Sequence, residues 1–201
     1  PNIYKKCLSI GIDLTKDMIP VVPAAHYCCG GIKVNLNGES SIRRLYALGE
    51  ASSTGLHGGN RLASNSMMEA AVYADAAARH AISVIDSIEL QRDIPAWDYE
   101  GTAVPEEMAL ITQDYKEMQQ IMTNYVGIVR SDVRLERAKR RLEIIFKETE
   151  ELYLKSTLSQ HLCELRNMIA VGYLIIKQAE ARHESVGLHY SIDYPAKPVE
   201  I

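Results

Sequence analysis

The strongest constraint on the fold is a helical period that runs through the second half of the chain. Between residues 106 and 183, apolar side chains recur every three to four positions in three successive segments. This spacing places them on one face of a helix. We expect Asp132 to cap the second segment, and Ser156 or Thr157 to cap the third. Because the connections are short, neighbouring helices should be antiparallel, and a three-helix bundle is predicted.

The first sixty residues follow a different pattern, with many glycines and short apolar runs. Residues 1–18 have the spacing of a short helix followed by a turn at Gly11. The later runs have the length of strands and are separated by turn residues. We expect strands at residues 19–22, 32–36 and 45–48. Asn37-Gly38 lies between two of these runs and predicts a hairpin turn.

A second helical pattern links these two regions. It begins between Ala63 and Ser66 and continues to Ile85 with many alanines. Small side chains allow a helix to lie close to a sheet or a cofactor. The stretch that follows is polar and contains Pro95 and Pro105. Since proline interrupts regular structure, we interpret this stretch as a linker.

Composition excludes several classes of function. The chain has 201 residues, 47% of them hydrophobic, and a net charge of −4. This length suits one large or two small domains. The charge gives no reason to expect nucleic acid as a partner. The longest apolar run, residues 168–176, is too short to span a membrane, which takes about 20 residues.

The cysteines and the basic residues do not predict a metal site or a nucleic-acid surface. None of the four cysteines forms a C-x-x-C pair, so we expect reduced thiols and no bound metal. Basic residues cluster between residues 134 and 141, where Glu136 interrupts them and Glu143 follows. A solvated helix face explains this run better than a binding surface.

The segment 49–69 contains the most chemical information. Glu50 follows a predicted strand, and α/β folds bind ligands at the carboxyl ends of strands. The next helix begins near Ser66, and a helix N-terminus offers free N–H groups and partial positive charge. Arg61 lies between them, and a guanidinium can bind a carboxylate through two hydrogen bonds. From the pattern alone, a structural loop, a salt-bridged Arg61 and a structural His26 remain alternatives.

Five short sequence motifs indicate more specifically which family the chain resembles. They are V-P-A-A-H-Y at 22–27, C-G-G at 29–31, L-Y-A-L-G-E at 45–50, T-G-L-H-G at 54–58 and N-R-L-A-S-N-S at 60–66. In this order they closely resemble the L-aspartate oxidases, a branch of the succinate dehydrogenase and fumarate reductase flavoprotein family. The tail, E-S-V-G-L-H-Y at 184–190, resembles the end of that family's helical domain. The resemblance therefore covers nearly the whole chain.

The resemblance implies roles for individual residues. His26 and Arg61 would bind carboxylate oxygens of the substrate, and Glu50 would accept hydrogen bonds from ribose hydroxyls of FAD. Backbone N–H groups of Ser66 and Met67 would meet the isoalloxazine ring, and residues 57–60 would shape the loop beneath it. The proton-accepting arginine of the family is expected upstream of residue 1. No catalytic residue is therefore assigned in this chain.

The resemblance also implies an activity and partners. The family oxidises a dicarboxylate by hydride transfer to the flavin. Its L-aspartate oxidases convert L-aspartate to iminoaspartate in NAD biosynthesis, with oxygen or fumarate as the acceptor. We therefore expect FAD as cofactor, L-aspartate as substrate and a cytoplasmic location. Quinolinate synthase consumes the product, which makes it a candidate transient partner.

The expected fold is α+β and mostly α. It combines the C-terminal part of an FAD-binding α/β domain with an antiparallel three-helix bundle. We assign residues 1–18 to the end of a substrate-capping region, 19–86 to the FAD-binding domain, 87–105 to the linker and 106–201 to a helical domain with an irregular tail. No G-x-G-x-x-G, which holds the FAD pyrophosphate, occurs in the chain. We therefore expect this chain alone to be inactive and not to retain FAD.

One residue departs from the family pattern, and two other assignments remain as alternatives. Val186 stands where the family usually has arginine, so a loop contact near the helical domain should be absent or rebuilt. A succinate dehydrogenase or fumarate reductase flavoprotein subunit is the nearest alternative, although those proteins usually lack the P-A-A-H and T-G-L-H motifs. A helical interaction module is an alternative of a different class.

Overall fold

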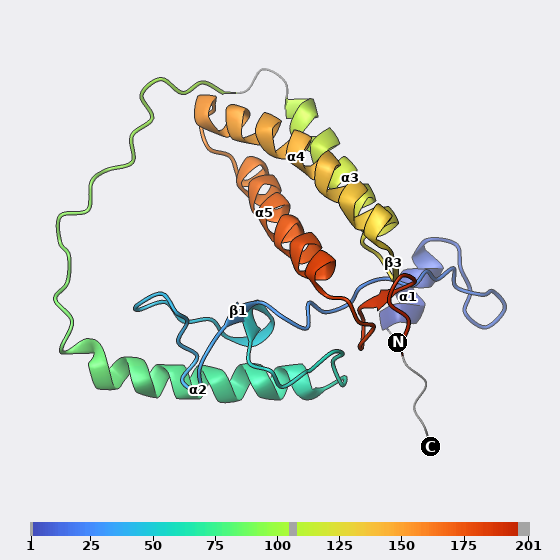
Figure 1. Ribbon diagram of the computed structural model, residues 1–201, viewed down its shortest axis with the longest axis horizontal. Coiled ribbons are helices and arrows are strands. Elements are labelled where there is room, and N and C mark those ends of the chain that lie inside the picture. Colours follow the sequence, from blue (N-terminus) through green and yellow to red (C-terminus); the bar gives the residue numbers. More distant parts are fainter. Residues whose placement is uncertain (1, 105–107, 197–201) are drawn as a thin grey trace.

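The computed structural model describes residues 2–104 and 108–196, and it is mostly helical (Figure 1). After the short α1 (Asn2–Ser9), the long α2 (Asn65–Ile85) lies apart from a group of three helices. These three are α3 (Met108–Tyr125), α4 (Asp132–Lys155) and α5 (Gln160–Ala181). An extended segment without helix or strand connects α2 to this group (Figure 1). The predicted helix start at Glu106 lies outside the described residues.

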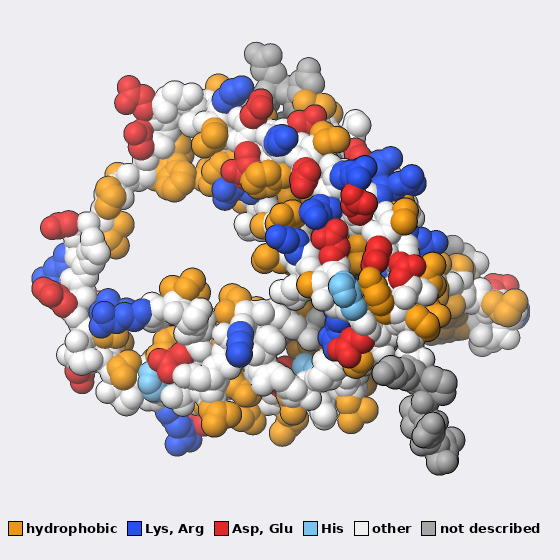
Figure 2. Space-filling model, viewed as in Figure 1, with side chains coloured by type: hydrophobic (Ala, Val, Ile, Leu, Met, Phe, Trp, Pro, Cys, Tyr) orange, Lys and Arg blue, Asp and Glu red, His pale blue; other side chains and the backbone are white. Residues whose placement is uncertain are grey.

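The helices α3, α4 and α5 share one hydrophobic core. Their buried side chains recur at the helical spacing seen in the sequence, because that spacing turns them toward the neighbouring helices. The fully buried members include Met118, Leu135, Leu142, Leu162, Leu165, Ile169 and Ile176. Gly172 of α5 allows close approach, since a Cβ there would lie 2.2 Å from the terminal carbon of Met118. Charged side chains of both signs are interspersed over the outer surface of these helices (Figure 2).

The helix caps differ from the sequence expectation. Ser131, not Asp132, is the N-cap of α4: its backbone is extended and its Oγ accepts a hydrogen bond from the Arg134 N–H. Asp132 is the first helical residue, where a carboxylate is favourable near the positive end of the helix dipole. Ser159 caps α5 in the same way, in place of Ser156 or Thr157. Ser156 instead pairs with the linker at Ala103, which keeps the chain extended before the helix.

The predicted strands are mostly not formed. Residues 19–22 form no strand, and the run 32–36 contributes only β1 (Ile32–Lys33), which pairs in parallel with β2 (Ser52–Ser53). The run 45–48 contributes one isolated bridge and is followed by the short 3-10 helix η1 (Gly49–Ala51). A strand needs a hydrogen-bonded neighbour. An apolar run that finds no partner among the described residues stays extended without becoming a strand.

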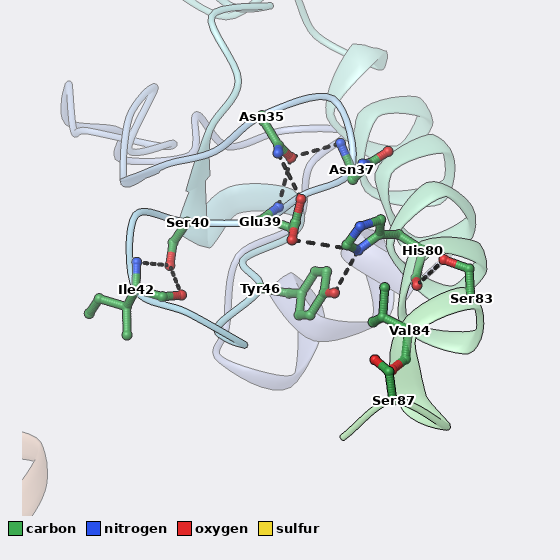
Figure 3. Close-up of polar contacts among 10 residues, drawn as sticks. All are labelled: Asn35, Asn37, Glu39, Ser40, Ile42, Tyr46, His80, Ser83, Val84 and Ser87. Atoms are coloured by element: carbon green, nitrogen blue, oxygen red, sulfur yellow. Dashed lines mark hydrogen bonds and ion pairs between the residues drawn. The ribbon is translucent and has the colours of Figure 1, made fainter. Parts of the chain in front are cut away.

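A polar network fixes the loop before η1 to the C-terminal half of α2 (Figure 3). Tyr46 and Glu39 form an antiparallel bridge, and Asn35 closes the turn that the sequence predicts at Asn37-Gly38. The Tyr46 hydroxyl lies 2.7 Å from Nδ1 of His80 on α2, and a Glu39 carboxylate oxygen lies 3.6 Å from the same nitrogen. These contacts hold the C-terminal half of α2 against the loop.

The tail is more regular than expected. β4 (Tyr190–Ser191) pairs in parallel with β3 (Val129–Arg130), which directly precedes α4. Two further hydrogen bonds reach the first residue of α4: its N–H donates to Asp193, and its carboxylate accepts from the Tyr194 hydroxyl. The tail is therefore fastened to the N-terminus of α4. Residues 197–201 lie outside the described part of the chain.

None of the described helices is long and apolar enough to cross a membrane.

Candidate functional site

The candidate site is the loop between β2 and α2 together with the residues it contacts. Its turns are closed by backbone hydrogen bonds, from the Gly58 N–H to Gly55 O and from the Asn60 N–H to His57 O. Ser64, the residue before α2, has a φ of 76° and makes no side-chain capping bond. The first N–H groups of α2 are consequently not capped by that side chain. Such groups favour an anion or a partly negative ligand atom.

Arg61 is held in a defined position within this loop. Its guanidinium carbon lies 4.5 Å from the centroid of the Tyr27 ring, a cation–π contact. Its Nη1 donates a hydrogen bond to the Ser66 hydroxyl at 3.1 Å. Because Tyr27 belongs to the segment 22–27 and Ser66 to α2, Arg61 joins two segments that the sequence places far apart.

A buried carboxylate lies behind the same loop. Glu69, in the first half of α2, is only 3% exposed. One of its oxygens lies 2.7 Å from His57 Nε2, and the other accepts a hydrogen bond from the Thr54 hydroxyl. The His57 ring in turn meets the Tyr27 ring edge-on, with centroids 5.2 Å apart. The loop, α2 and Tyr27 thus form one connected cluster.

Glu50 lies in η1 and is exposed. Its Oε1 accepts a hydrogen bond from the Cys28 N–H at 3.1 Å. Partial burial, with the nearby charge of Glu50, raises the pKa of the Cys28 thiol. Cys28 is therefore a neutral thiol at neutral pH, not a reactive thiolate.

The structure brings only some of the predicted site residues into contact. Arg61 and Ser66 are hydrogen-bonded, while Glu50 contacts the segment that contains His26 through the backbone of Cys28. His26 is exposed and directly precedes Tyr27, the residue beneath Arg61. The Met67 side chain is 80% exposed at the start of α2.

Sequence reasoning missed three members of the cluster: Glu69, Thr54 and Tyr27. Glu69 could have been noticed, because it is a single acidic residue among the small and apolar residues that open α2. A charge at such a position needs a buried partner. The partners themselves lie 12 and 15 residues earlier, and no periodic pattern in the chain connects them.

The tail of the helical part reaches the outer side of this loop. The Leu188 N–H donates to the Gly59 carbonyl at 2.9 Å. A Cβ on Gly187, whose φ is +58°, would lie 2.1 Å from that same carbonyl oxygen, so only glycine fits there. A Val186 methyl carbon would lie 3.2 Å from a Cβ on Gly59. At this position the loop is therefore met by the Val186 side chain and by the backbone of residues 187–188.

Comparison with known proteins gives matches along nearly the whole chain. Residues 1–67 match the family described as FAD binding domain, and residues 115–198 match the family described as fumarate reductase flavoprotein C-term. L-aspartate oxidase of Vibrio cholerae is 44% identical over 100% of this chain and 37% of its own length. L-aspartate oxidase of Yersinia pestis is 47% identical over 97% of this chain and 37% of its own length. The chain thus spans little more than a third of these relatives.

Solved structures give the same picture of the fold. An E. coli quinol fumarate reductase superposes with a TM-score of 0.79 at 26% identity, covering 99% of this chain and 37% of the other. The Mycobacterium smegmatis Sdh1 complex superposes with a TM-score of 0.76 at 27% identity, covering 98% of this chain and 35% of the other. The arrangement of helices and short strands is therefore one that larger solved proteins contain.

Proposed function

Because this chain belongs to the L-aspartate oxidases of the FAD-dependent fumarate reductase flavoprotein family, we propose that it forms one wall of a substrate and flavin site. The whole protein would oxidise L-aspartate to iminoaspartate, a step of NAD biosynthesis, with oxygen or fumarate as electron acceptor. The observation that carries this proposal is the 44–47% identity to L-aspartate oxidases across almost the entire chain. The chain by itself would be inactive.

Arg61 and His26 would bind the dicarboxylate. A guanidinium fixed between an aromatic ring and a serine hydroxyl loses little freedom when it binds a carboxylate. Only Nη1 of Arg61 is engaged by the Ser66 hydroxyl, so other N–H groups are available to a substrate. His26 is exposed beside this position and can donate a further hydrogen bond. The proton-accepting arginine would be supplied by a part of the protein outside this chain.

The residues present fit FAD. The uncapped N–H groups of α2 near Ser66 and Met67 suit the partly negative edge of an isoalloxazine ring. The second oxygen of Glu50 suits a ribose hydroxyl, since the first is already held by Cys28. When bound, FAD supplies the hydride acceptor of the reaction. The role of this chain would be to bind and orient the cofactor edge and the substrate carboxylates.

The division of labour within the chain is also proposed. Residues 1–18 would end a substrate-capping region, 19–86 would complete the FAD-binding domain and 87–105 would link it to the helical domain of 106–201. The helices α3, α4 and α5 would form an antiparallel three-helix bundle, which their common core supports. We also propose a cytoplasmic location and transient contact with quinolinate synthase, because both are expected of a protein with this activity.

The test is substrate-dependent flavin reduction by the full-length protein without oxygen. We expect L-aspartate to bleach the flavin absorbance, and succinate not to bleach it. Arg61→Gln should raise KM for L-aspartate about 10- to 100-fold, because a charge-assisted hydrogen bond contributes about 1.5–3 kcal/mol. Arg43→Gln is the matched control, since Arg43 is an exposed arginine of the same half of the chain.

Two results would contradict the proposal. Bleaching by succinate in place of L-aspartate would identify the protein as a succinate-oxidising member of the family. Equal KM values for the Arg61→Gln and Arg43→Gln proteins would remove Arg61 from the substrate site.

A further inference from the structure

The carboxylate of Glu69 is buried, although no role in substrate or flavin binding has been given to it. Its side chain is 1% exposed and that of His57 is 8% exposed. Burying a carboxylate is unfavourable unless its oxygens accept hydrogen bonds. Both oxygens of Glu69 do so, one from Thr54 and one from His57. A carboxylate with this arrangement fixes the groups that surround it.

These groups lead to Arg61 through one aromatic ring. The His57 ring meets the Tyr27 ring edge-on, and the Tyr27 ring lies beneath the Arg61 guanidinium. Ser66, whose hydroxyl accepts from Arg61, lies on the same helix as Glu69. Glu69 therefore holds, through His57, the ring that lies beneath the guanidinium.

Thr54 connects Glu69 to the start of the loop as well. Its hydroxyl donates to Glu69 and accepts a hydrogen bond from the Leu56 N–H at 3.1 Å. The turn that begins at Thr54 and the helix that begins at Asn65 are thus tied to one carboxylate. If Glu69 were lost, two part-buried donors would lack an acceptor, and the loop would have to rearrange to satisfy them.

We propose that Glu69 is a positioning residue that holds Arg61 in the orientation needed to bind a dicarboxylate. It acts through His57 and Tyr27 and does not touch the substrate. This inference rests on the proposed function, because it assumes that Arg61 binds the substrate carboxylate. It differs from a purely structural role in one respect: the effect of Glu69 on ligand binding should depend on the presence of Arg61.

The experiment measures the binding of succinate, as a four-carbon dicarboxylate probe, to the full-length FAD-loaded protein. Binding is followed by the change in the flavin spectrum. We expect Glu69→Ala to raise the Kd for succinate about tenfold or more, as the loss of one or two hydrogen bonds would. Glu69→Gln keeps the shape and one acceptor and should raise the Kd less, by about threefold. If Glu69→Ala does not retain FAD, Glu69→Gln carries the test.

Two comparisons separate positioning from general stability. In an Arg61→Gln background, the Glu69 substitutions should cause no further rise in Kd, because the residue they act through is already gone. Asp75→Asn is the control on the same helix, where Asp75 is exposed and pairs with Arg79. It should bind succinate like the unmodified protein.

The possible failures are distinct. Absence of succinate binding by the unmodified protein would overturn the proposed function, and the role of Glu69 with it. Normal succinate binding by the Glu69 variants would overturn the role of Glu69 alone. Additive effects of the Glu69 and Arg61 substitutions would also overturn it, because Glu69 would then act independently of Arg61.

Discussion

His189 is the buried residue around which the tail is organised. Its Nδ1 accepts a hydrogen bond from the Arg130 guanidinium at 3.0 Å, and its Nε2 donates to the Arg182 carbonyl at 3.2 Å. These two bonds require a neutral imidazole with its proton on Nε2. Burial, followed by the positive charge of Arg130, lowers the pKa of His189 below its usual value of 6.5.

This shift predicts how stability depends on pH. In the unfolded chain His189 takes up a proton near pH 6.5, whereas in the folded chain it does so only at lower pH. The unfolded state therefore binds more protons in that interval, and the free energy of unfolding should fall as pH decreases below about 6.5. Urea unfolding followed by circular dichroism at several pH values measures the effect.

The matching variant is His189→Gln, which keeps a donor near Arg182 and removes the titrating ring. It should flatten the pH dependence of stability in the range below about pH 6.5. His161→Gln, at an exposed position on α5, is the control and should leave the dependence in place. An unchanged pH profile for His189→Gln would show that another group is responsible.

Helices were easier to predict from the sequence than strands, for a physical reason. A helix closes its hydrogen bonds within one segment, so the spacing of Leu135, Leu142 and Ile169 is enough to indicate α4 and α5. A strand depends on a neighbour. Ile32 and Lys33 became β1 because residues 52–53 lie beside them, whereas the similar run at 19–22 found no partner among the described residues.

Helix ends were less predictable than helix interiors. Ser131 and Asp132 are both favoured N-cap residues, and only the extended backbone of Ser131 identifies the cap. The carboxylate of Asp132 is instead used by Tyr194, which the sequence places 62 residues away. Local preference indicates a cap within one to three residues, and tertiary contacts select the position.

The N-cap of α4 allows a prediction about the stability of this helix. Ser131→Ala removes the acceptor of the Arg134 N–H and should lower the free energy of unfolding by about 1 kcal/mol. Ser131→Gly should lower the free energy of unfolding by only roughly a few tenths of a kcal/mol, because glycine leaves the helix end open to water. An unchanged free energy of unfolding for Ser131→Ala, measured by urea unfolding, would mean that the hydroxyl is not the stabilising group.

At the scale of the whole molecule, the two helical parts differ in how they are stabilised. The helices α3, α4 and α5 bury a core of their own, whereas α2 buries only Glu69 and Ala77. The exposed apolar residues of α2 include Met67, Met68, Val72, Ile82 and Ile85. Stability should therefore reside mainly in the helical part after residue 108, and the candidate site should be the less stable region.

This difference leads to a prediction for the 201-residue chain alone. Purified from cells, it should show no visible flavin absorbance, because it has no G-x-G-x-x-G segment for the pyrophosphate. It should still unfold cooperatively in urea through its helical core. The full-length protein purified in the same way is the reference and should be yellow. Stoichiometric flavin in the shorter chain would contradict the prediction.

The hydrogen bond between Leu188 and Gly59 has a consequence for the order of events during synthesis. Residues 54–61 leave the ribosome long before residue 188, so the loop first forms without its outer contact. At translation rates of about 5–20 residues per second, the delay is several seconds. The final geometry of the loop is therefore reached only when nearly all of the described chain has emerged.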